Sequence, residues 1–327
     1  MAEGVGLSII IPMYNVGDYL DKCIASLLRT DGIGNAQIIL VDDGSTDSTA
    51  KIADDYTREY SNISVIHKQN EGPSEARNTG IRASEGKYLF FCDADDEVNP
   101  DELSKVISSL DTVNADILLW DAELFNDTGD PIPDKRKDYF IHRGLNENDG
   151  VITGEQTLEK QLDACMNYPA TVWLGIHSKE FLLNNGLYFE KGLLHEDELW
   201  ATLALLYAKR VMYIQRKVYR YRIHTGSITN PMTDDRTQHI ESLLVLYPRL
   251  YSFCEESVGS VTLKRKLEAT LTRRYLHMIF EYDFCKRGYA DRLDIGLLWR
   301  TSVRLIDKCR VIVLAVKVTV RRLFGGR

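Results

Sequence analysis

Three aspartates, Asp93, Asp95 and Asp96, crowd the segment DADD directly after the apolar run YLFFC at 88–92. Like charges packed this closely cost free energy unless a cation offsets them. Carboxylate oxygens suit Mg²⁺ or Mn²⁺, and Mg²⁺ typically binds one or two carboxylates together with substrate phosphates. The segment therefore indicates a metal and phosphate site. The alternative is a solvated acidic turn before a helix that begins near residue 100.

A second acidic segment, DDGSTD, begins with Asp42 and Asp43 after the apolar run QIILV at 37–41. Two adjacent carboxylates at the end of a strand suit hydrogen bonds to the N–H and hydroxyl groups of a ligand. The simpler alternative is a turn in which Ser45 or Asp47 caps the following helix.

A third acidic segment, HEDELW at 195–200, places Glu196 and Asp197 at a predicted helix start. Carboxylates are common there for the helix dipole alone. Read singly, the pair is therefore compatible with capping as well as with chemistry.

The segment RYRIHTGSIT at 220–229 combines His224, Ser227 and two arginines, Arg220 and Arg222, near a glycine turn. Such a loop can place hydrogen-bond donors against a diphosphate. Alternating Arg and Tyr also describes an exposed strand, so this segment carries little weight alone.

These segments need a scaffold, and the first 120 residues predict one. Short apolar runs alternate with amphipathic stretches, which predicts βαβ units: an α/β fold with a mainly parallel central sheet flanked by helices. Ligands of such sheets bind beyond the carboxyl ends of the strands, which selects the loops PMYN, DDGSTD and DADD. The predicted strands are 7–11, 37–41, 63–67, 88–92 and 116–120, and the predicted helices are 17–29, 47–60, 74–84 and 100–111.

Taken together, six segments resemble the family-2 glycosyltransferases, whose GT-A fold is a nucleotide-diphospho-sugar transferase fold. The resemblance spans residues 7–230. It implies an inverting enzyme that moves a sugar from a UDP-sugar to a glycan or lipid-linked acceptor. The matching segments, in order, are SIIIPMYN (8–15), VDDGSTD (41–47), NEGPSEARNTG (70–80), GKYLFFCDADD (86–96), HEDELW (195–200) and RYRIHTGSIT (220–229).

The resemblance also implies roles for single residues. Asp197 would be the general base, with Glu196 beside it as the second catalytic residue. Asp95 would ligate the Mg²⁺ or Mn²⁺ ion that bridges the diphosphate. An ordinary aspartate pKa of about 3.9 is low for a base, so positioning must contribute much of the catalysis.

Donor binding is implied for residues from several of the segments. Tyr14 would lie near the base, Asp43 would hydrogen-bond the uracil ring and Asp93 would meet the ribose. Arg77 would face the base or the phosphates. The full donor-binding set is Pro12, Tyr14, Asp42, Asp43, Arg77, Asp93, His224 and Ser227.

One departure from the family concerns the acceptor side. Members often carry W-x-K there, whereas this chain reads TVWLGIHSKE. Trp173 is present and marks the predicted acceptor region, but Gly175 occupies the lysine position and the nearest lysine is Lys179. The sequence therefore does not identify the acceptor.

We expect two parts in the chain. Residues 1–230 form the predicted catalytic domain, with a donor-binding part at 7–125 and an acceptor and base part at 150–230. Residues 231–327 form a predicted helical region that ends in a basic amphipathic tail.

The charge of the chain is unevenly distributed. The net charge is -8 over 327 residues, which argues against nucleic acid as a partner. Residues 287–327 hold 10 Lys and Arg against 3 Asp, a net of +7 that leaves -15 for residues 1–286. A basic segment with Trp299 and Phe324 can lie in a membrane plane. We therefore expect peripheral contact through 291–327; the alternative is a helix packed on the catalytic domain.

The expected location is cytoplasmic, at the inner face of the cell membrane. The six cysteines are scattered and the first residues do not form a secretion signal. The longest apolar run of the tail, 311–316, is too short to span a bilayer.

Two other functions are alternatives to a glycosyltransferase. A sugar-nucleotide nucleotidyltransferase shares a related sheet, but such enzymes usually carry a glycine-rich loop after the first strand, where this chain has PMYNVGDY. A non-catalytic nucleotide- or glycan-binding protein would not need intact carboxylates at 43, 95 and 197.

Overall fold

An eight-stranded sheet forms the centre of the protein, with the strand order β3-β2-β1-β4-β7-β6-β8-β5. The structure is a computed structural model that describes residues 6–128, 132, 140–224 and 235–324, with residues 322–324 described by their backbone only. The strands are β1 (Leu7–Met13), β2 (Gln37–Asp42), β3 (Ile63–His67), β4 (Tyr88–Phe91), β5 (Glu97–Val98), β6 (Ile117–Phe125), β7 (Gly175–Ser178) and β8 (Val211–Arg222).

Strands β1 to β4 form the parallel half of this sheet. Strand β1 pairs in parallel with β2 and with β4, and β2 pairs in parallel with β3. The sequence LSIIIPM of β1 is apolar almost throughout because helices cover both faces of a parallel sheet. Helix α3 (Pro73–Ala83) approaches β1 so closely that a Cβ atom at Gly80 would lie 2.2 Å from Ile10 Cγ2. This close approach explains the glycine in NEGPSEARNTG.

The second half of the sheet is mixed. Strand β7 runs antiparallel between β4 and β6, and β5 pairs antiparallel with β8, whereas β6 and β8 are parallel. The predicted α/β fold with a mainly parallel sheet is confirmed. Strands β5 and β7 were not predicted, because two and four residues are too few for a periodic signal.

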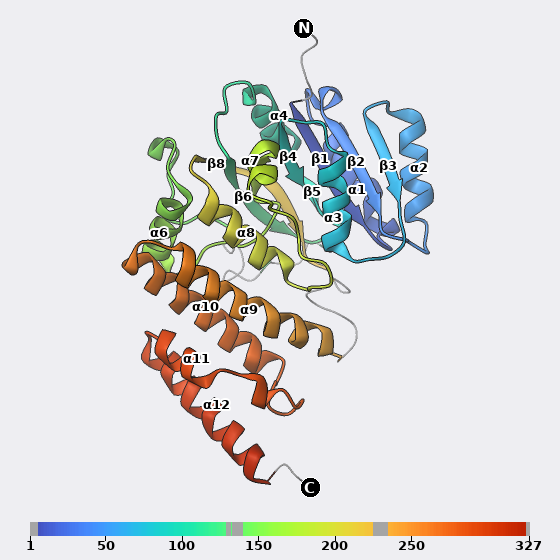
Figure 1. Cartoon of the computed structure of the whole chain (residues 1–327). Helices are drawn as coiled ribbons and strands as arrows, with labels where there is room; N and C mark the ends of the chain where they lie inside the picture. Colours follow the sequence, from blue (N-terminus) through green and yellow to red (C-terminus); the bar gives the residue numbers. More distant parts are fainter. Residues whose placement is uncertain (1–5, 129–131, 133–139, 225–234, 325–327) are drawn as a thin grey trace.

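Helices surround the sheet and continue beyond it (Figure 1). The four predicted early helices are confirmed to within two residues at each end. The helices are α1 (Gly17–Leu28), α2 (Thr49–Glu59), α3 (Pro73–Ala83), α4 (Pro100–Ser109), α6 (Gly154–Cys165), α7 (Lys179–Asn184), α8 (Glu196–Tyr207), α9 (Thr237–Ser257), α10 (Val261–Glu281), α11 (Ile295–Thr301) and α12 (Leu305–Phe324).

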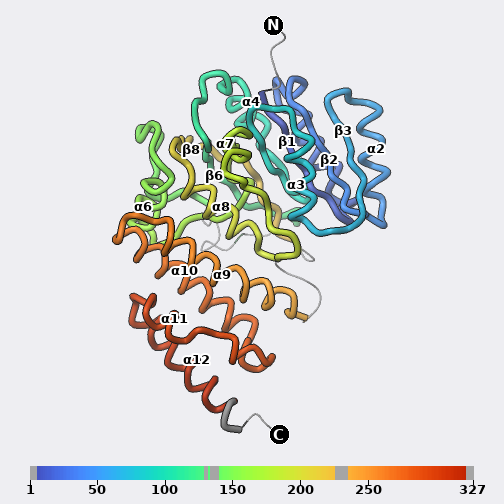
Figure 2. Tube along the Cα trace, viewed as in Figure 1, coloured from blue at the N-terminus to red at the C-terminus, as the bar shows by residue number. Residues whose placement is uncertain are grey.

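The C-terminal region is helical, as predicted, and it packs on helices α6 and α8 of the preceding part. Helix α9 contacts α8, and α10 contacts α6, α9, α11 and α12. Figures 1 and 2 show α9 and α10 side by side between the sheet and the last two helices. Tyr247 of α9 stacks on Tyr275 of α10 with ring centroids 4.3 Å apart. Among the described helices, none combines the length and the hydropathy needed to cross a membrane.

Candidate active site

Parallel pairing of β1, β2 and β4 brings the loops that follow these strands to one edge of the sheet, as predicted. The loops after β1 and β2 are tied together directly. The backbone N–H of Asn15 donates to Ser45 Oγ over 3.1 Å, and that of Thr46 donates to Asn15 Oδ1 over 2.8 Å. Pro12 is half-buried at this edge, and Tyr14 is 49% exposed at its rim.

Asp42 and Asp43 are both buried, and both already accept hydrogen bonds from the protein. Asp43 accepts from Lys68 Nζ at 2.7 Å and from the backbone N–H of Gly72 at 2.7 Å. Asp42 accepts from His67 Nδ1 at 2.8 Å. In this structure the pair fixes the chain between β3 and α3. A third donor, the backbone N–H of Glu71, lies 3.0 Å from Asp43 Oδ1. Because a carboxylate has about four acceptor positions, about one remains on Asp43 for a ligand.

Arg77, on α3, joins the donor side of the site to the predicted base side. Its Nη2 lies 2.9 Å from Asp93 Oδ1 and its Nη1 lies 2.5 Å from Glu196 Oε1, while its guanidinium also covers the ring of Phe189. Burial alone would lower the pKa of Arg77, but Asp93 and Glu196 raise it, so the guanidinium stays charged. Arg77 therefore faces two carboxylates here; its predicted contact with the base or phosphates stays a prediction.

The first turn of α8 holds the predicted base. His195 precedes it with φ of 63°, in the left-handed region that non-glycine residues rarely adopt, and its side chain does not cap the helix. Burial and the adjacent charge of Glu196 raise the pKa of Asp197 to about 8. The expectation of an ordinary, weakly basic aspartate was wrong, because the sequence does not reveal burial. A carboxylate with a raised pKa is a stronger base.

Helices α9 and α10 hold this turn from the C-terminal side, a role that the sequence did not reveal. The backbone N–H of Leu194 donates to Ser242 Oγ over 2.9 Å, and His195 Nε2 lies 3.0 Å from His239 Nδ1. Burial lowers the pKa of His195 and lowers that of His239 to about 4, so both rings are neutral at pH 7 and one donates to the other.

Two further contacts from these helices reach Glu198, one residue after Asp197. Tyr247 OH lies 3.1 Å from Glu198 Oε2, and Arg274 Nη1 lies 3.0 Å from Glu198 Oε1. The residues flanking Glu196 and Asp197 on both sides are thus anchored on the C-terminal region.

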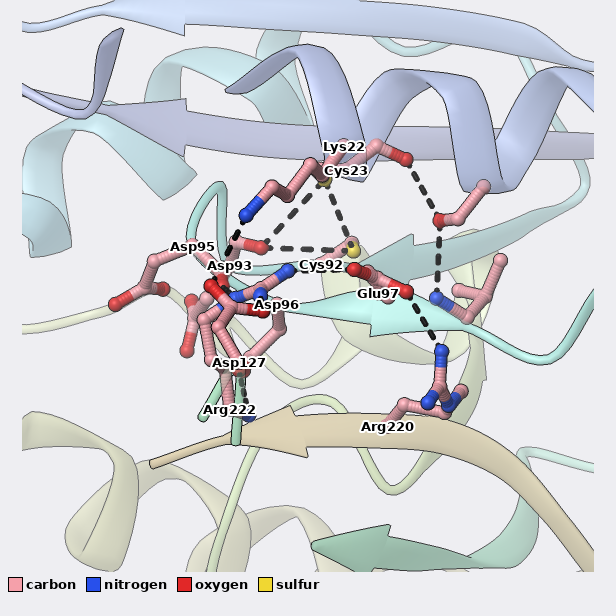
Figure 3. A network of polar contacts seen from close by, with 12 residues as sticks. Lys22, Cys23, Cys92, Asp93, Asp95, Asp96, Glu97, Asp127, Arg220 and Arg222 are labelled. Carbon is pink, nitrogen blue, oxygen red and sulfur yellow. Dashed lines mark hydrogen bonds and ion pairs between the residues drawn. The ribbon is translucent and has the colours of Figure 1, made fainter. Parts of the chain in front are cut away.

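The three aspartates of DADD have different surroundings (Figure 3). Asp96 is buried and accepts from Tyr219 OH and from the backbone N–H of Arg222, both at 2.7 Å. Burial, together with Asp95 and Asp93, raises the pKa of Asp96 well above its usual range. Asp96 is therefore a structural residue.

Asp95 lies at the edge of the same network, and its carboxylate points away from Cys92 and Glu97 (Figure 3). Its Oδ2 atom lies 2.9 Å from His224 Nε2, and the two side chains are 30% and 15% exposed. A carboxylate and an imidazole that both reach solvent fit a divalent cation whose other ligands are phosphates and water. Within the described residues, no three His, Cys, Asp or Glu side chains converge into a complete ligand set.

The arginines of RYRIH hold the DADD loop through carboxylates. Arg222 has a fully buried side chain, pairs with Glu97 at 2.6 Å and with Asp127, and donates from Nε to the Asp95 carbonyl at 2.8 Å. Arg220 pairs with Glu97 at 2.6 Å. The interpretation of these arginines as diphosphate ligands is not supported, because adjacent carboxylates already neutralise them. Ser227 lies outside the described residues.

Trp173 belongs to an aromatic cluster beneath the site. It is 4% exposed and stacks on Tyr219 with centroids 4.3 Å apart, and Phe140 meets it edge-on at 4.6 Å. The departure at Gly175 has a steric cause: a Cβ atom there would lie 2.4 Å from the carbonyl oxygen of Leu118 on β6. A lysine does not fit this backbone, so the family's W-x-K cannot be restored here by one substitution.

Comparison with known proteins agrees with this geometry. The sequence profile of Glycosyl transferase family 2 matches residues 8–170. The chain is 34% identical over 227 residues to the uncharacterized glycosyltransferase YibD of Escherichia coli K12, a match that covers 68% of this chain and 63% of that protein. It is 29% identical over 302 residues to the uncharacterized glycosyltransferase EpsJ of Bacillus subtilis 168, a match that covers 86% and 85%.

Solved structures share the fold, and two of them carry a bound nucleotide sugar. Staphylococcus aureus TarS 1–349 in complex with UDP-GlcNAc aligns with a TM-score of 0.69 at 20% identity, over 98% of this chain and 92% of that one. The mannosyltransferase PcManGT from Pyrobaculum calidifontis, in complex with GDP-Man and Mn²⁺, aligns with a TM-score of 0.54 at 14% identity, over 99% and 88%.

The fold and the matched profile define a glycosyltransferase of the GT-A type. The chain belongs to glycosyltransferase family 2.

Proposed function

We propose that this enzyme transfers a sugar from a UDP-sugar, with inversion, to a hydroxyl group of a glycan or lipid-linked acceptor in surface-glycan synthesis. The observation that carries the proposal is the Arg77 bridge between Asp93 and Glu196. This bridge joins the donor edge of the sheet to the helix turn that holds Asp197.

The proposed reaction is a single displacement. The acceptor oxygen attacks the anomeric carbon, its proton passes to the Asp197 carboxylate, and the bond from that carbon to the diphosphate breaks, so UDP leaves and the configuration inverts. The raised pKa of Asp197 brings its basicity close to working pH. Glu196 supplies the neighbouring charge and is itself held by Arg77 at 2.5 Å.

Donor binding is proposed at the edge formed by the loops after β1, β2 and β4. Tyr14 offers an exposed ring to the base, Asp43 would use the acceptor position that its three protein donors leave, and Asp93 would meet the ribose. The UDP-GlcNAc complex of TarS supports UDP as the nucleotide, and the GDP-Man complex of PcManGT makes GDP the competitor to test.

Asp95 and His224 would hold a Mg²⁺ or Mn²⁺ ion, together with the donor phosphates. Such an ion supplies Lewis-acid neutralisation of the charge that accumulates on the leaving diphosphate. The Mn²⁺ in the PcManGT complex supports a divalent ion as the cofactor; the choice of Asp95 and His224 rests on their contact in this chain.

The acceptor class is proposed from relatives. TarS of Staphylococcus aureus is named a poly(ribitol-phosphate) β-N-acetylglucosaminyltransferase, which supports a surface polymer as the acceptor of a similar chain. We further propose that the enzyme works at the cytoplasmic face of the membrane, where residues 291–327 would make peripheral contact.

The experiment that tests the function is a nucleotide-sugar screen. Thermal stabilisation and nucleotide release are measured with UDP- and GDP-sugars, each with and without Mn²⁺. We expect stabilisation by UDP-sugars that depends on the metal. Stabilisation by GDP-sugars alone would overturn the proposed donor class, and no response to any nucleotide sugar would overturn the proposed donor site.

A further inference from the structure

Helix α12 carries an exposed apolar face in addition to the face that it buries. At helical spacing, six large apolar side chains lie on its outer side, and each is about half exposed or more, up to 79% at Leu305. We call this set the outer stripe; it consists of Leu305, Ile306, Ile312, Val313, Val316 and Val320.

The outer stripe is separate from the packing face of the same helix. Val311, Leu314 and Val318 are nearly fully buried where α12 packs on α10 and α11. Asp307 is buried on that inner side too, 3.2 Å from Arg304 Nε. Because the inner face already anchors the helix, the outer stripe does not contribute to this core. Isolated exposed apolar residues are ordinary, but a contiguous stripe marks an interaction site.

Basic side chains border the stripe. At 100° per residue, Arg310 and Lys317 follow one edge of it and Lys308 follows the other. Lys308 lies over the exposed ring of Trp299, with Nζ 5.1 Å from its centroid. The sequence of α12 contains one carboxylate, the buried Asp307. An apolar stripe between cationic borders is the pattern of a helix that lies flat in a lipid interface.

We propose that the outer stripe docks on an anionic lipid surface, with α12 parallel to the membrane plane. The apolar side chains would enter the acyl boundary while the basic borders meet lipid phosphates. A second copy of this face would bring cation against cation, since neither border offers a carboxylate. The inference rests on the proposed membrane location, and it names the face that makes the contact.

The single exposed tryptophan provides a local probe. Trp120, Trp173 and Trp200 are at most 4% exposed, whereas Trp299 is 45% exposed, and the chain has four tryptophans in all. Fluorescence of the full-length protein is measured with vesicles of phosphatidylcholine alone and of phosphatidylcholine mixed with phosphatidylglycerol, with and without brominated chains. We expect quenching by brominated anionic vesicles that weakens at high salt and is lost in Trp299→Phe.

Point variants are preferable to a truncation, because Leu298 and Thr301 are buried against the rest of the region. The double variant Ile312→Ser/Val316→Ser should bind anionic vesicles about tenfold more weakly or worse, since each buried methylene contributes about fourfold in affinity. The control is Val261→Ser, which makes the same kind of apolar-to-polar change at an 80% exposed position on α10, away from the outer stripe.

Flotation of both variants decides between the outcomes. Loss of binding in the double variant alone, with both variants unfolding at the wild-type temperature, supports the proposal. Equal binding by wild-type protein and double variant, or no binding to anionic vesicles, overturns it. A dimer in solution that the double variant abolishes also overturns it, because the stripe then covers a second copy. UDP release by soluble protein is independent of vesicle binding, so it reports separately on the proposed function.

Discussion

Arg77 Nη1 lies 2.5 Å from Glu196 Oε1, and this ion pair connects α3 to the first turn of α8 across the candidate site. The second arm of Arg77 reaches Asp93 at 2.9 Å. One buried cation therefore partly neutralises carboxylates from both sides of the site. At Asp197, burial and the charge of Glu196 outweigh the opposing effect of Arg77, so the pKa of Asp197 is raised.

This electrostatic arrangement predicts the pH dependence of transfer. Only ionised Asp197 accepts a proton, so activity should fall as the pH falls through its raised pKa, well above the value of an ordinary aspartate. In Glu196→Gln the neighbouring negative charge is gone, and the acidic limb of kcat should move to lower pH. The measurement is a pH profile of kcat for both proteins. An acidic limb that does not move would show that Glu196 does not set this pKa.

Metal dependence should be lost in Asp95→Asn. The substitution keeps the size of the side chain but removes the anionic oxygen that lies beside His224. We expect UDP to stabilise the wild-type protein more in the presence of Mn²⁺, and we expect this increment to vanish in the variant. Asp101→Asn, at an exposed carboxylate in the first turn of α4, is the matched control. Unchanged Mn²⁺-linked stabilisation in Asp95→Asn would refute the assignment.

The contact between His239 and His195 should matter for turnover and not for donor affinity. His239→Ala removes the side chain that holds the residue before Glu196, so Asp197 is less well positioned, and kcat should fall about 10- to 100-fold. His239→Asn can restore one hydrogen bond and should recover part of the loss. Steady-state kinetics with a saturating acceptor separates kcat from the donor KM. An equal loss of donor binding would point to general disruption instead.

Trp173 should contribute mainly to stability. Its ring is buried between Tyr219 and Phe140, and replacement by alanine should lower the free energy of unfolding by about 3–5 kcal/mol. Denaturant unfolding measures this loss. Ala substitution at Tyr188, which is 42% exposed, is the control and should change stability little. A small effect at Trp173 would favour a direct role at the acceptor.

Periodic segments were predictable from the sequence because local pattern determines them. Runs such as LSIII and QIILV are apolar on both faces, and their order predicted the parallel half of the sheet and the loops that carry Asp43 and Asp95. Strand β7 gave no such signal, since GIHS is short and contains a glycine that β6 requires for close approach.

Long-range contacts were not predictable, and they decide several roles. Nothing near Asp96 or Arg222 in the sequence shows that the two meet across 126 positions, so the different roles within DADD needed the structure. The same holds for Ser242 and His239, which reach the start of α8 from α9. The raised pKa of Asp197 follows from burial, which is a property of the folded chain.

The most direct test of the account is the rate of UDP release from a saturating UDP-sugar, with acceptor present, in wild-type protein and in Asp197→Asn. The asparagine keeps the shape of the side chain and removes the base. We expect the rate to fall by about 10²–10⁴ while the affinity for UDP stays near that of the wild type. Turnover within a few-fold of the wild-type rate would contradict the account, because the proton would then be taken by a group other than Asp197.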